Sequence, residues 1–342
     1  MGRIAIVWLW SVGILAAPAD ETKLQRFEFV RTEMAVPVKL VFYCIDRDTA
    51  NRAAEAAYAR AHQLNGILTD YDPDSELRRL CATAGEGKAV PVSEDLWRVL
   101  VRSKEISERS GGAFDVTVGP VVRLWRRARR QEEFPPADRL DEARRLVGYK
   151  LVRLDPAHRA VELLKPEMRL DLGGIAKGYV IDQLLAELGK HGIQRALVDA
   201  GGDVGLGDPP PDKPGWQIAV ASLDPKEKPG RFLSLSNCGV ATSGDTWQFV
   251  ELNGRRYSHL IDPRTGIGLT DHSNVTAVAP DAMTADALAS AVSVLGPEAG
   301  LRMVEEMPGA AALILRAPEG KLETYESCRW KKLSSAGPRL AR

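Results

Sequence analysis

The sequence has no net charge, few cysteines and only five histidines. Its 46 Lys and Arg residues equal its 46 Asp and Glu residues, so no global positive field would hold nucleic acid by counterion release. The cysteines lie far apart and form no CxxC pair: Cys44, Cys81, Cys238 and Cys328. This spacing gives no sign of zinc ligation or of a redox couple. Two interpretations of the cysteines are compatible with the sequence: disulfides in an oxidising compartment, or buried free thiols.

Long hydrophobic runs are absent apart from one near the N-terminus. It follows Arg3 and extends from Ile4 to Ala17, which is too short for a comfortable transmembrane helix. Small residues flank Pro18, as at a signal-peptidase site. We therefore predict a signal peptide at residues 1–19 and a mature protein that is periplasmic or otherwise exported, without a stable membrane span. A buried core strand or helix is the alternative for this stretch.

The overall composition is that of an ordinary globular protein. Hydrophobic residues make up 44% and charged residues 27%, and we find no internal repeat or low-complexity tract. The strongest loop signals, residues 135–140 and 208–215, are not followed by a change in composition that would mark a second domain. We predict one domain at residues 20–333 and a disordered tail at residues 334–342.

Helical and strand-like patterns alternate in the first half of the chain, and short strands dominate the second half. Ser93 is typical of a helix start and Gly111-Gly112 of a helix end. The predicted helices are 47–68, 93–110, 174–190, 284–295 and 298–307, and the predicted strands are 36–44, 196–198, 217–221, 232–235, 256–261, 275–279 and 311–316. This mixture predicts an α+β fold. The basic run at 123–130, which contains Trp125, is interpreted as a solvated helix face or loop.

The densest unusual segment is LDLGGIAKGYVID at residues 170–182. Here Asp171 precedes a glycine pair and a helical pattern that contains Lys177. A Gly-rich entry into a helix exposes unpaired backbone N–H groups at the positive end of the helix dipole, which favours phosphate binding. The segment is neither GxGxxG nor GxxxxGKS, so those mechanisms do not apply. A tight strand-to-helix turn is the alternative.

A glycine cluster and a histidine follow. The cluster at residues 199–203 lets backbone approach a ligand closely, or forms a left-handed turn between strands. His259 lies at the end of a predicted strand, before a turn that carries Asp262, Arg264 and Thr265. A lone histidine is more often structural than catalytic, but these polar neighbours favour a role in proton transfer.

Asp286 and Ser290 form the fourth candidate group. They are four residues apart in a predicted helix, so both oxygens project from one face. Mg²⁺ prefers such hard oxygen ligands and completes its shell with phosphate and water. The two residues therefore predict a magnesium site. The alternative is that they are ordinary polar residues in the first turn of an amphipathic helix.

Six segments in this order resemble motifs of the FAD:protein FMN transferase family, often called the ApbE family. They are GGAFDVTVGP at 111–120, DLGGIAKGY at 171–179, the glycine cluster that ends at Asp203, ATSGD at 241–245, HLIDPRTG at 259–266 and TADALASA at 284–291. The resemblance spans roughly Met34 to Arg316. It implies a single T-fold-related flavin transferase domain with mixed or antiparallel sheets and packed helices.

The resemblance also implies roles for individual residues. The positions that contact FAD in the family are matched by Met34, Tyr71, Ala113, Phe114, Asp115, Asp171, Lys177 and Leu260. The magnesium ligands are matched by the backbone carbonyl of Gly174 and the side chains of Asp286 and Ser290, and the residue proposed to activate the acceptor hydroxyl is matched by His259. The chain departs from the family at four places. Ser290 replaces a common Thr, Ala35-Val36 replaces Gly-Thr, and Cys81 replaces Asn. After Asp245 the chain has Thr246-Trp247, whereas the family usually has an aromatic residue directly after the aspartate.

The reaction implied is magnesium-dependent transfer of the FMN moiety of FAD to a Ser or Thr hydroxyl of a target protein, with release of AMP. Such transfer requires positioning and charge neutralisation above all. His259 would accept the hydroxyl proton, and Lys177 would offset charge on the diphosphate. The resemblance implies an exported or membrane-bound electron-transfer protein as acceptor. The alternatives are an FAD pyrophosphatase, with water as acceptor, and a periplasmic flavin-binding protein without turnover.

Overall fold

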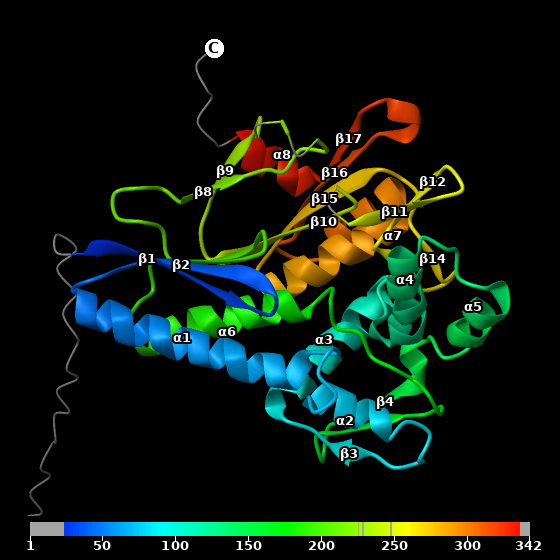
Figure 1. Cartoon of the computed structure of the whole chain (residues 1–342). Coiled ribbons are helices and arrows are strands. Elements are labelled where there is room, and N and C mark those ends of the chain that lie inside the picture. Colours follow the sequence, from blue (N-terminus) through cyan, green and yellow to red (C-terminus); the bar gives the residue numbers. More distant parts are fainter. Residues whose placement is uncertain (1–23, 225, 228, 247, 336–342) are drawn as a thin grey trace, which may run out of the picture.

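Figure 1 shows the computed structural model of the chain, which describes residues 24–335 apart from 225, 228 and 247. The predicted signal peptide lies outside these residues. Of the predicted tail, only residues 334 and 335 are described, and they end a helix. The four cysteines are free thiols. In the described part of the chain, no helix has both the length and the apolar character needed to span a membrane.

An eight-stranded sheet forms the centre of the molecule, in the order β1-β2-β6-β7-β10-β15-β16-β17. All neighbouring strands are antiparallel. The strands are β1 (Gln25–Glu33), β2 (Val36–Cys44), β6 (Ala196–Ala200), β7 (Asp203–Leu206), β10 (Cys238–Gly244), β15 (Ser273–Ala279), β16 (Ala311–Arg316) and β17 (Glu323–Glu326). Every residue of β15 is buried, because both faces of the sheet are covered at this point.

Three long helices cover one face of this sheet: α1 (Arg47–Leu68), α6 (Ala176–Lys190) and α7 (Ala282–Glu306). Helix α1 begins at Asp46, whose side chain accepts a hydrogen bond from the Thr49 amide at 2.7 Å. Its buried face is rich in alanine, which lets it pack closely against α6. Helix α7 is broken at Gly296, where φ is 75° and a proline follows, so the two helices predicted in this region are confirmed.

The opposite face is covered by a hairpin and the last helix. These are β8 (Trp216–Ala219), β9 (Phe232–Leu235) and α8 (Cys328–Ser335). Trp330, which is fully buried, lies at the centre of the apolar cluster that they form with the sheet. The sheet therefore has an apolar core on each side, and the α+β prediction is confirmed.

A helical lobe extends from one end of the helix layer (Figure 1). It comprises α2 (Glu76–Ala82), α3 (Glu94–Arg109), α4 (Gly119–Gln131), α5 (Ala137–Arg144), β3 (Val90–Pro91), β4 (Val152–Asp155) and β5 (Ala160–Leu163). Two hairpins pack against it, namely β11 (Phe249–Leu252) with β12 (Arg255–Ser258), and β13 (Ile261–Asp262) with β14 (Ile267–Gly268). Trp125 of α4 joins lobe and hairpins, because its indole N–H donates to the Gly266 carbonyl at 2.8 Å and its ring contacts Tyr257.

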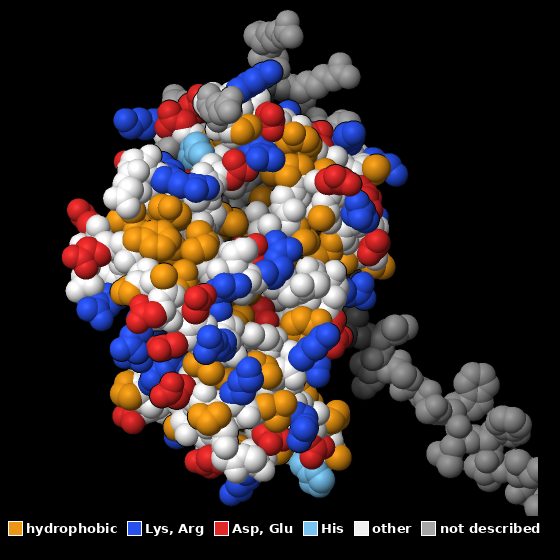
Figure 2. All heavy atoms as spheres, turned by 90° about the vertical axis from the view of Figure 1, so that its right-hand side faces the viewer, with side chains coloured by type: hydrophobic (Ala, Val, Ile, Leu, Met, Phe, Trp, Pro, Cys, Tyr) orange, Lys and Arg blue, Asp and Glu red, His pale blue; other side chains and the backbone are white. Residues whose placement is uncertain are grey.

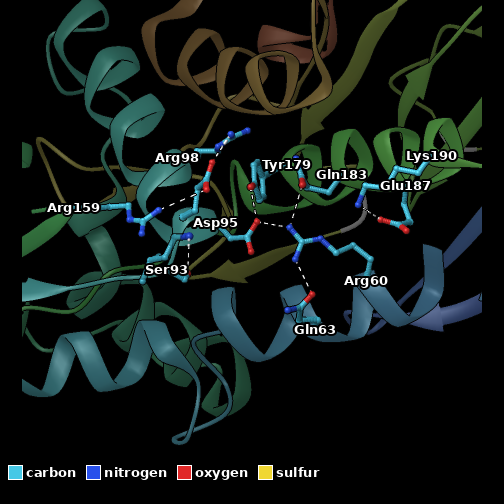
Figure 3. A network of polar contacts seen from close by, with 12 residues as sticks. Arg60, Gln63, Ser93, Asp95, Arg98, Arg159, Tyr179, Gln183, Glu187 and Lys190 are labelled. Atoms are coloured by element: carbon cyan, nitrogen blue, oxygen red, sulfur yellow. Dashed lines mark hydrogen bonds and ion pairs between the residues drawn. The ribbon is translucent and has the colours of Figure 1, made fainter. Parts of the chain in front are cut away.

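A polar network fixes the lobe to the helix layer (Figure 3). Asp95 of α3 accepts hydrogen bonds from the guanidinium of Arg60 in α1 at 2.5 Å and from the hydroxyl of Tyr179 in α6 at 2.7 Å. Arg60 also donates to the Gln183 amide oxygen at 3.1 Å. The half-buried pair of Arg60 and Asp95 thus ties three helices together next to the N-terminal turns of α6.

Gly178 allows α6 and α7 to cross in contact. A Cβ at this position would lie 2.2 Å from the Ala282 carbonyl oxygen, which is backbone and cannot rotate away. We expect Gly178→Ala to lower the free energy of unfolding by about 1–3 kcal/mol, the usual cost of overpacking a core. Thermal unfolding measures this, with Gly66→Ala as the control, because nothing lies within 4 Å of the Cβ there. A Gly178→Ala protein that melts no lower than Gly66→Ala would show that the helices do not meet this closely.

Candidate active site

A cavity of about 400 Å³ lies where the helix layer, the helical lobe and the two hairpins meet. We call it the central cavity. Its lining includes every predicted site residue except Met34, namely Tyr71, Ala113, Phe114, Asp115, Asp171, Gly174, Lys177, His259, Leu260, Asp286 and Ser290. These residues come from segments as far apart in the sequence as the loop after α1 and the first half of α7. The fold thus brings the separate motifs into one site.

Met34 lies outside the lining of this cavity. It occupies the two-residue turn between β1 and β2, with φ of 52° followed by 60° at Ala35. Positive φ at both residues is the geometry of a tight hairpin turn, in which glycine is the unstrained choice at the second position. The family glycine that Ala35 replaces would therefore fit this turn. The start of β2, which follows the turn, contacts the lining residue Gly201, whose amide donates to the Pro37 carbonyl at 3.2 Å.

The three residues of the predicted magnesium site, Gly174, Asp286 and Ser290, all line the central cavity, the last two from α7. A Cβ at Gly174 would lie 2.9 Å from the Ser290 hydroxyl oxygen, so the glycine lets the 174 backbone approach that side chain closely. Asp286, one turn earlier in α7, is 6% exposed, and its Oδ2 accepts a hydrogen bond from the Gly178 amide at 3.1 Å. Among the described residues, nothing donates a hydrogen bond to its Oδ1. Among the described residues, Oδ1 is not one of the fully buried oxygens that lack a partner, so it is open to the cavity, where a carboxylate oxygen is suited to a cation.

The donor set fits Mg²⁺ better than a transition metal. In the described part of the chain, no group of three or more His, Cys, Asp or Glu side chains is placed to hold a metal ion. A single carboxylate with a hydroxyl and a carbonyl leaves room for water and phosphate ligands, as Mg²⁺ requires. Burial and the neighbouring Asp203 raise the pKa of Asp286, which means that its negative charge has too little compensation from the protein alone.

Lys177 carries a fixed positive charge in the central cavity. It forms an ion pair with Asp203, a buried residue whose Oδ1 accepts from the Thr242 amide at 3.1 Å. Burial by itself would lower the pKa of Lys177, but the carboxylates of Asp203 and Asp286 outweigh that effect and raise it to about 12. Lys177 is therefore suited to attract an anion and not to accept a proton.

His259 is held in one tautomer by the backbone. Its Nδ1 lies 3.2 Å from the Gln248 carbonyl oxygen, which can only accept, so Nδ1 carries the proton and Nε2 keeps its lone pair. Burial lowers the pKa of His259 from its usual value, and the charges of Arg129 and Lys177 lower it further. The imidazole is accordingly neutral at pH 7, which is the state that a general base needs.

Arg126 connects the polar residues at the entrance of the cavity. Its guanidinium pairs with Asp171 at 2.8 Å and with Asp70 at 2.5 Å, and lies 4.4 Å from the ring centre of Tyr71. The Tyr71 side chain is otherwise exposed, so this cation–π contact holds its ring at the rim. Asp171 also accepts from the Gly173 amide at 2.8 Å and thereby shapes the glycine turn before α6.

Asp115 is used mainly to hold its own loop. Its Oδ1 accepts from the amide and the hydroxyl of Thr117 at 2.8 and 2.6 Å, and its Oδ2 accepts from the Tyr149 amide at 2.6 Å. These bonds fix residues 113–118 against the cavity, where Ala113 and Phe114 contribute apolar surface. The position of the loop thus depends on this carboxylate.

Some lining residues were not predicted from the sequence, namely Arg126, Arg129, Thr242, Ser243 and Gln248. The basic run was interpreted as a solvated face, and the structure divides it: Arg126 and Arg129 point to the cavity, whereas Arg127 and Arg130 are exposed. A spacing of three or four residues between Val122, Arg126 and Arg129 was the available signal. Thr242 and Ser243 lie in the recognised ATSGD motif.

Known proteins resemble this chain over most of its length. The chain matches the ApbE family over residues 33–314 and belongs to it. It is 33% identical over 347 residues to the FAD:protein FMN transferase of Haemophilus influenzae, with 97% of each chain covered. It is 36% identical over 280 residues to that of Treponema pallidum, covering 77% of this chain and 76% of the relative. The apo crystal structure of the Pseudomonas stutzeri flavinyl transferase ApbE superposes with a TM-score of 0.81 at 28% identity, covering 92% of this chain and 98% of that one.

Proposed function

We propose that this chain is an FAD:protein FMN transferase, which cleaves FAD and attaches the FMN moiety to a Ser or Thr hydroxyl of a target protein. The observation that carries the proposal is the convergence in one cavity of a neutral histidine, a fixed ammonium group and a cluster of oxygen donors. The relatives that match nearly the whole chain bear the name of this activity. The predicted enzyme class and function agree with these names.

The proton step uses His259. Its Nε2 lone pair accepts the proton of the acceptor hydroxyl as the hydroxyl oxygen attacks the phosphorus next to riboflavin. One P–O bond forms to the acceptor, and the P–O bond to the AMP phosphate breaks. AMP leaves with its phosphate, and the histidine later returns its proton to solvent. Because the Gln248 carbonyl holds Nδ1–H, the imidazole keeps its orientation throughout.

The charge on the diphosphate is met by groups of this chain. Lys177, held in place by Asp203, supplies a positive charge in the first turn of α6, at the positive end of the helix dipole. Asp286, Ser290 and the Gly174 carbonyl would hold Mg²⁺. When bound, the ion would neutralise negative charge on the diphosphate oxygens and on the leaving phosphate.

The site and the N-terminal sequence together suggest where the enzyme works. Residues 1–19 are proposed to direct the chain out of the cytoplasm, and the acceptor is proposed to be an exported or membrane-bound electron-transfer protein. The apolar stretch after Arg3 and the small residues around Pro18 support export. Fractionation of cells that express the full chain, with N-terminal sequencing of the mature protein, tests this.

The activity test follows AMP in solution and flavin on protein. Purified protein is incubated with FAD and Mg²⁺, with and without a candidate acceptor, and AMP is quantified while in-gel fluorescence detects bound flavin. AMP release that depends on Mg²⁺, with fluorescence on the acceptor, supports the proposal. AMP and free FMN without labelling would indicate the pyrophosphatase, and FAD binding without AMP would indicate the flavin-binding protein.

A further inference from the structure

A second cavity, of about 1040 Å³, lies between α2, α4, α5 and residues 167–169. Its lining contains seven arginines and three glutamates, although the chain as a whole has no net charge. We call it the arginine groove. Figure 2 looks onto the side on which α4 and α5 lie, and Lys and Arg side chains recur across the middle of that face. None of the groove residues lines the central cavity.

The central arginines of the groove have no carboxylate partner. Within the described residues, Arg78, Arg123 and Arg169 form no ion pair, whereas Arg139 at the edge pairs with Glu142 at 3.0 Å. Burial and the positive charges of Arg78 and Arg123 lower the pKa of Arg169, so its guanidinium group lies close enough to each of these two arginines to be repelled by it. An anionic group bound among them would relieve this repulsion.

Helix α4 separates the groove from the central cavity. Val122 lines the central cavity and the next residue, Arg123, lines the groove. At the other end of the helix, Arg129 lines the central cavity near His259, and Arg130 lines the groove. A helix with its side chains is roughly 10–12 Å across, a width that an extended polypeptide crosses in a few residues.

The shape of the groove favours a protein segment over a small phosphate compound. Its volume of about 1040 Å³ lies at the upper end of the roughly 300–1,000 Å³ that is usual for small-molecule sites, so the arrangement of its charges and not its volume decides between the two. Arg123, Arg127 and Arg130 are exposed and follow one another along α4 at helical spacing, so they offer an extended row of positive charge. We propose that the arginine groove binds an acidic segment of the acceptor protein and so holds the acceptor hydroxyl at His259. This inference rests on the proposed function.

The test removes three charges from the groove. We expect Arg123→Gln/Arg127→Gln/Arg130→Gln to bind an acidic peptide at least about tenfold more weakly, because steering and binding by these charges are lost. FAD binding should be unchanged, as should AMP release at an acceptor concentration that saturates the variant, because these residues do not line the central cavity. The matched control is Arg52→Gln/Arg109→Gln/Arg302→Gln, three exposed arginines on α1, α3 and α7.

The probe is a fluorescein-labelled peptide in which a Thr is flanked by aspartates and glutamates, compared with the same peptide carrying Asn and Gln. Anisotropy at low and at physiological ionic strength gives both affinities. Tighter binding of the acidic peptide, lost in the groove variant and kept in the control, supports the proposal. Equal affinity of the groove variant and the control variant for the acidic peptide would overturn it. Displacement of the peptide by pyrophosphate from the wild type and the groove variant alike would also overturn it, because the peptide would then be bound outside the groove. A wild-type protein that releases no AMP when FAD, Mg²⁺ and an acceptor are all present would instead overturn the proposed function.

Discussion

Asp286→Asn is expected to abolish FAD cleavage, with a fall of about 10³-fold or more in the rate of AMP release, because it removes the carboxylate of the proposed magnesium site. The protein should stay folded. An Asn side chain has the same shape, and its oxygen can still accept the hydrogen bond from the Gly178 amide. Because the change also removes a buried charge next to Asp203, thermal stability in the absence of metal should not fall. AMP release across a Mg²⁺ titration and a melting curve measure the two effects.

The control for this change lies five residues away. Asp281→Asn also removes a carboxylate, but at the N-cap of α7, where Asn caps as well as Asp. Asp281 does not line the central cavity, so its variant should cleave FAD as the wild type does. Turnover of Asp286→Asn close to that of Asp281→Asn at saturating Mg²⁺ would remove Asp286 from the metal site.

His259→Ala is expected to slow FMN transfer by about 10²–10⁴-fold, the range usual for loss of a general base. FAD affinity should change little, because the imidazole acts on the acceptor hydroxyl. The wild-type rate should fall as the pH drops through the lowered pKa of His259, because the protonated ring cannot accept a proton. Above that pKa the ring is neutral, and the rate no longer depends on the protonation of His259. The His259→Ala variant should not show the fall in rate at low pH.

Single-turnover labelling of an acceptor across a pH series separates these effects, together with a flavin-fluorescence titration for FAD. His158→Ala is the matched control, because its side chain is 77% exposed and pairs with Asp155 in the helical lobe, away from the central cavity. A His259→Ala enzyme that labels the acceptor at the rate of His158→Ala, with an unchanged acid limb, would show that another group takes the proton.

Long elements with a clear period were predictable from the sequence. The strands at 36–44, 232–235 and 311–316 and the helix at 47–68 have the predicted bounds. The prediction missed β10, because CGVATSG has small residues and no regular alternation. Its Gly239 is explained only by the packing of the sheet, since a Cβ there would lie 2.3 Å from the Ala282 Cα. Local sequence carries no sign of such a distant contact.

Helix α4 shows the same limit for the site. Val121, Trp125 and Ala128 are buried and recur at helical spacing, but the many arginines between them make this apolar pattern hard to recognise in the sequence. What places Arg126 and Arg129 at the central cavity is the bond from Trp125 to Gly266, which are 141 residues apart in the sequence. The site residues that lie in family motifs were predicted from the sequence. Arg126 and Arg129, whose place at the site depends on long-range packing, were not.

The most direct test of the account is the intact mass of the acceptor after incubation with the purified protein, FAD and Mg²⁺. A chemical bond to FMN predicts a mass increase of one FMN less one water, at a Ser or Thr, with one AMP released for each acceptor labelled. An acceptor of unchanged mass, in a reaction that still releases AMP and free FMN, would contradict transfer and identify water as the acceptor.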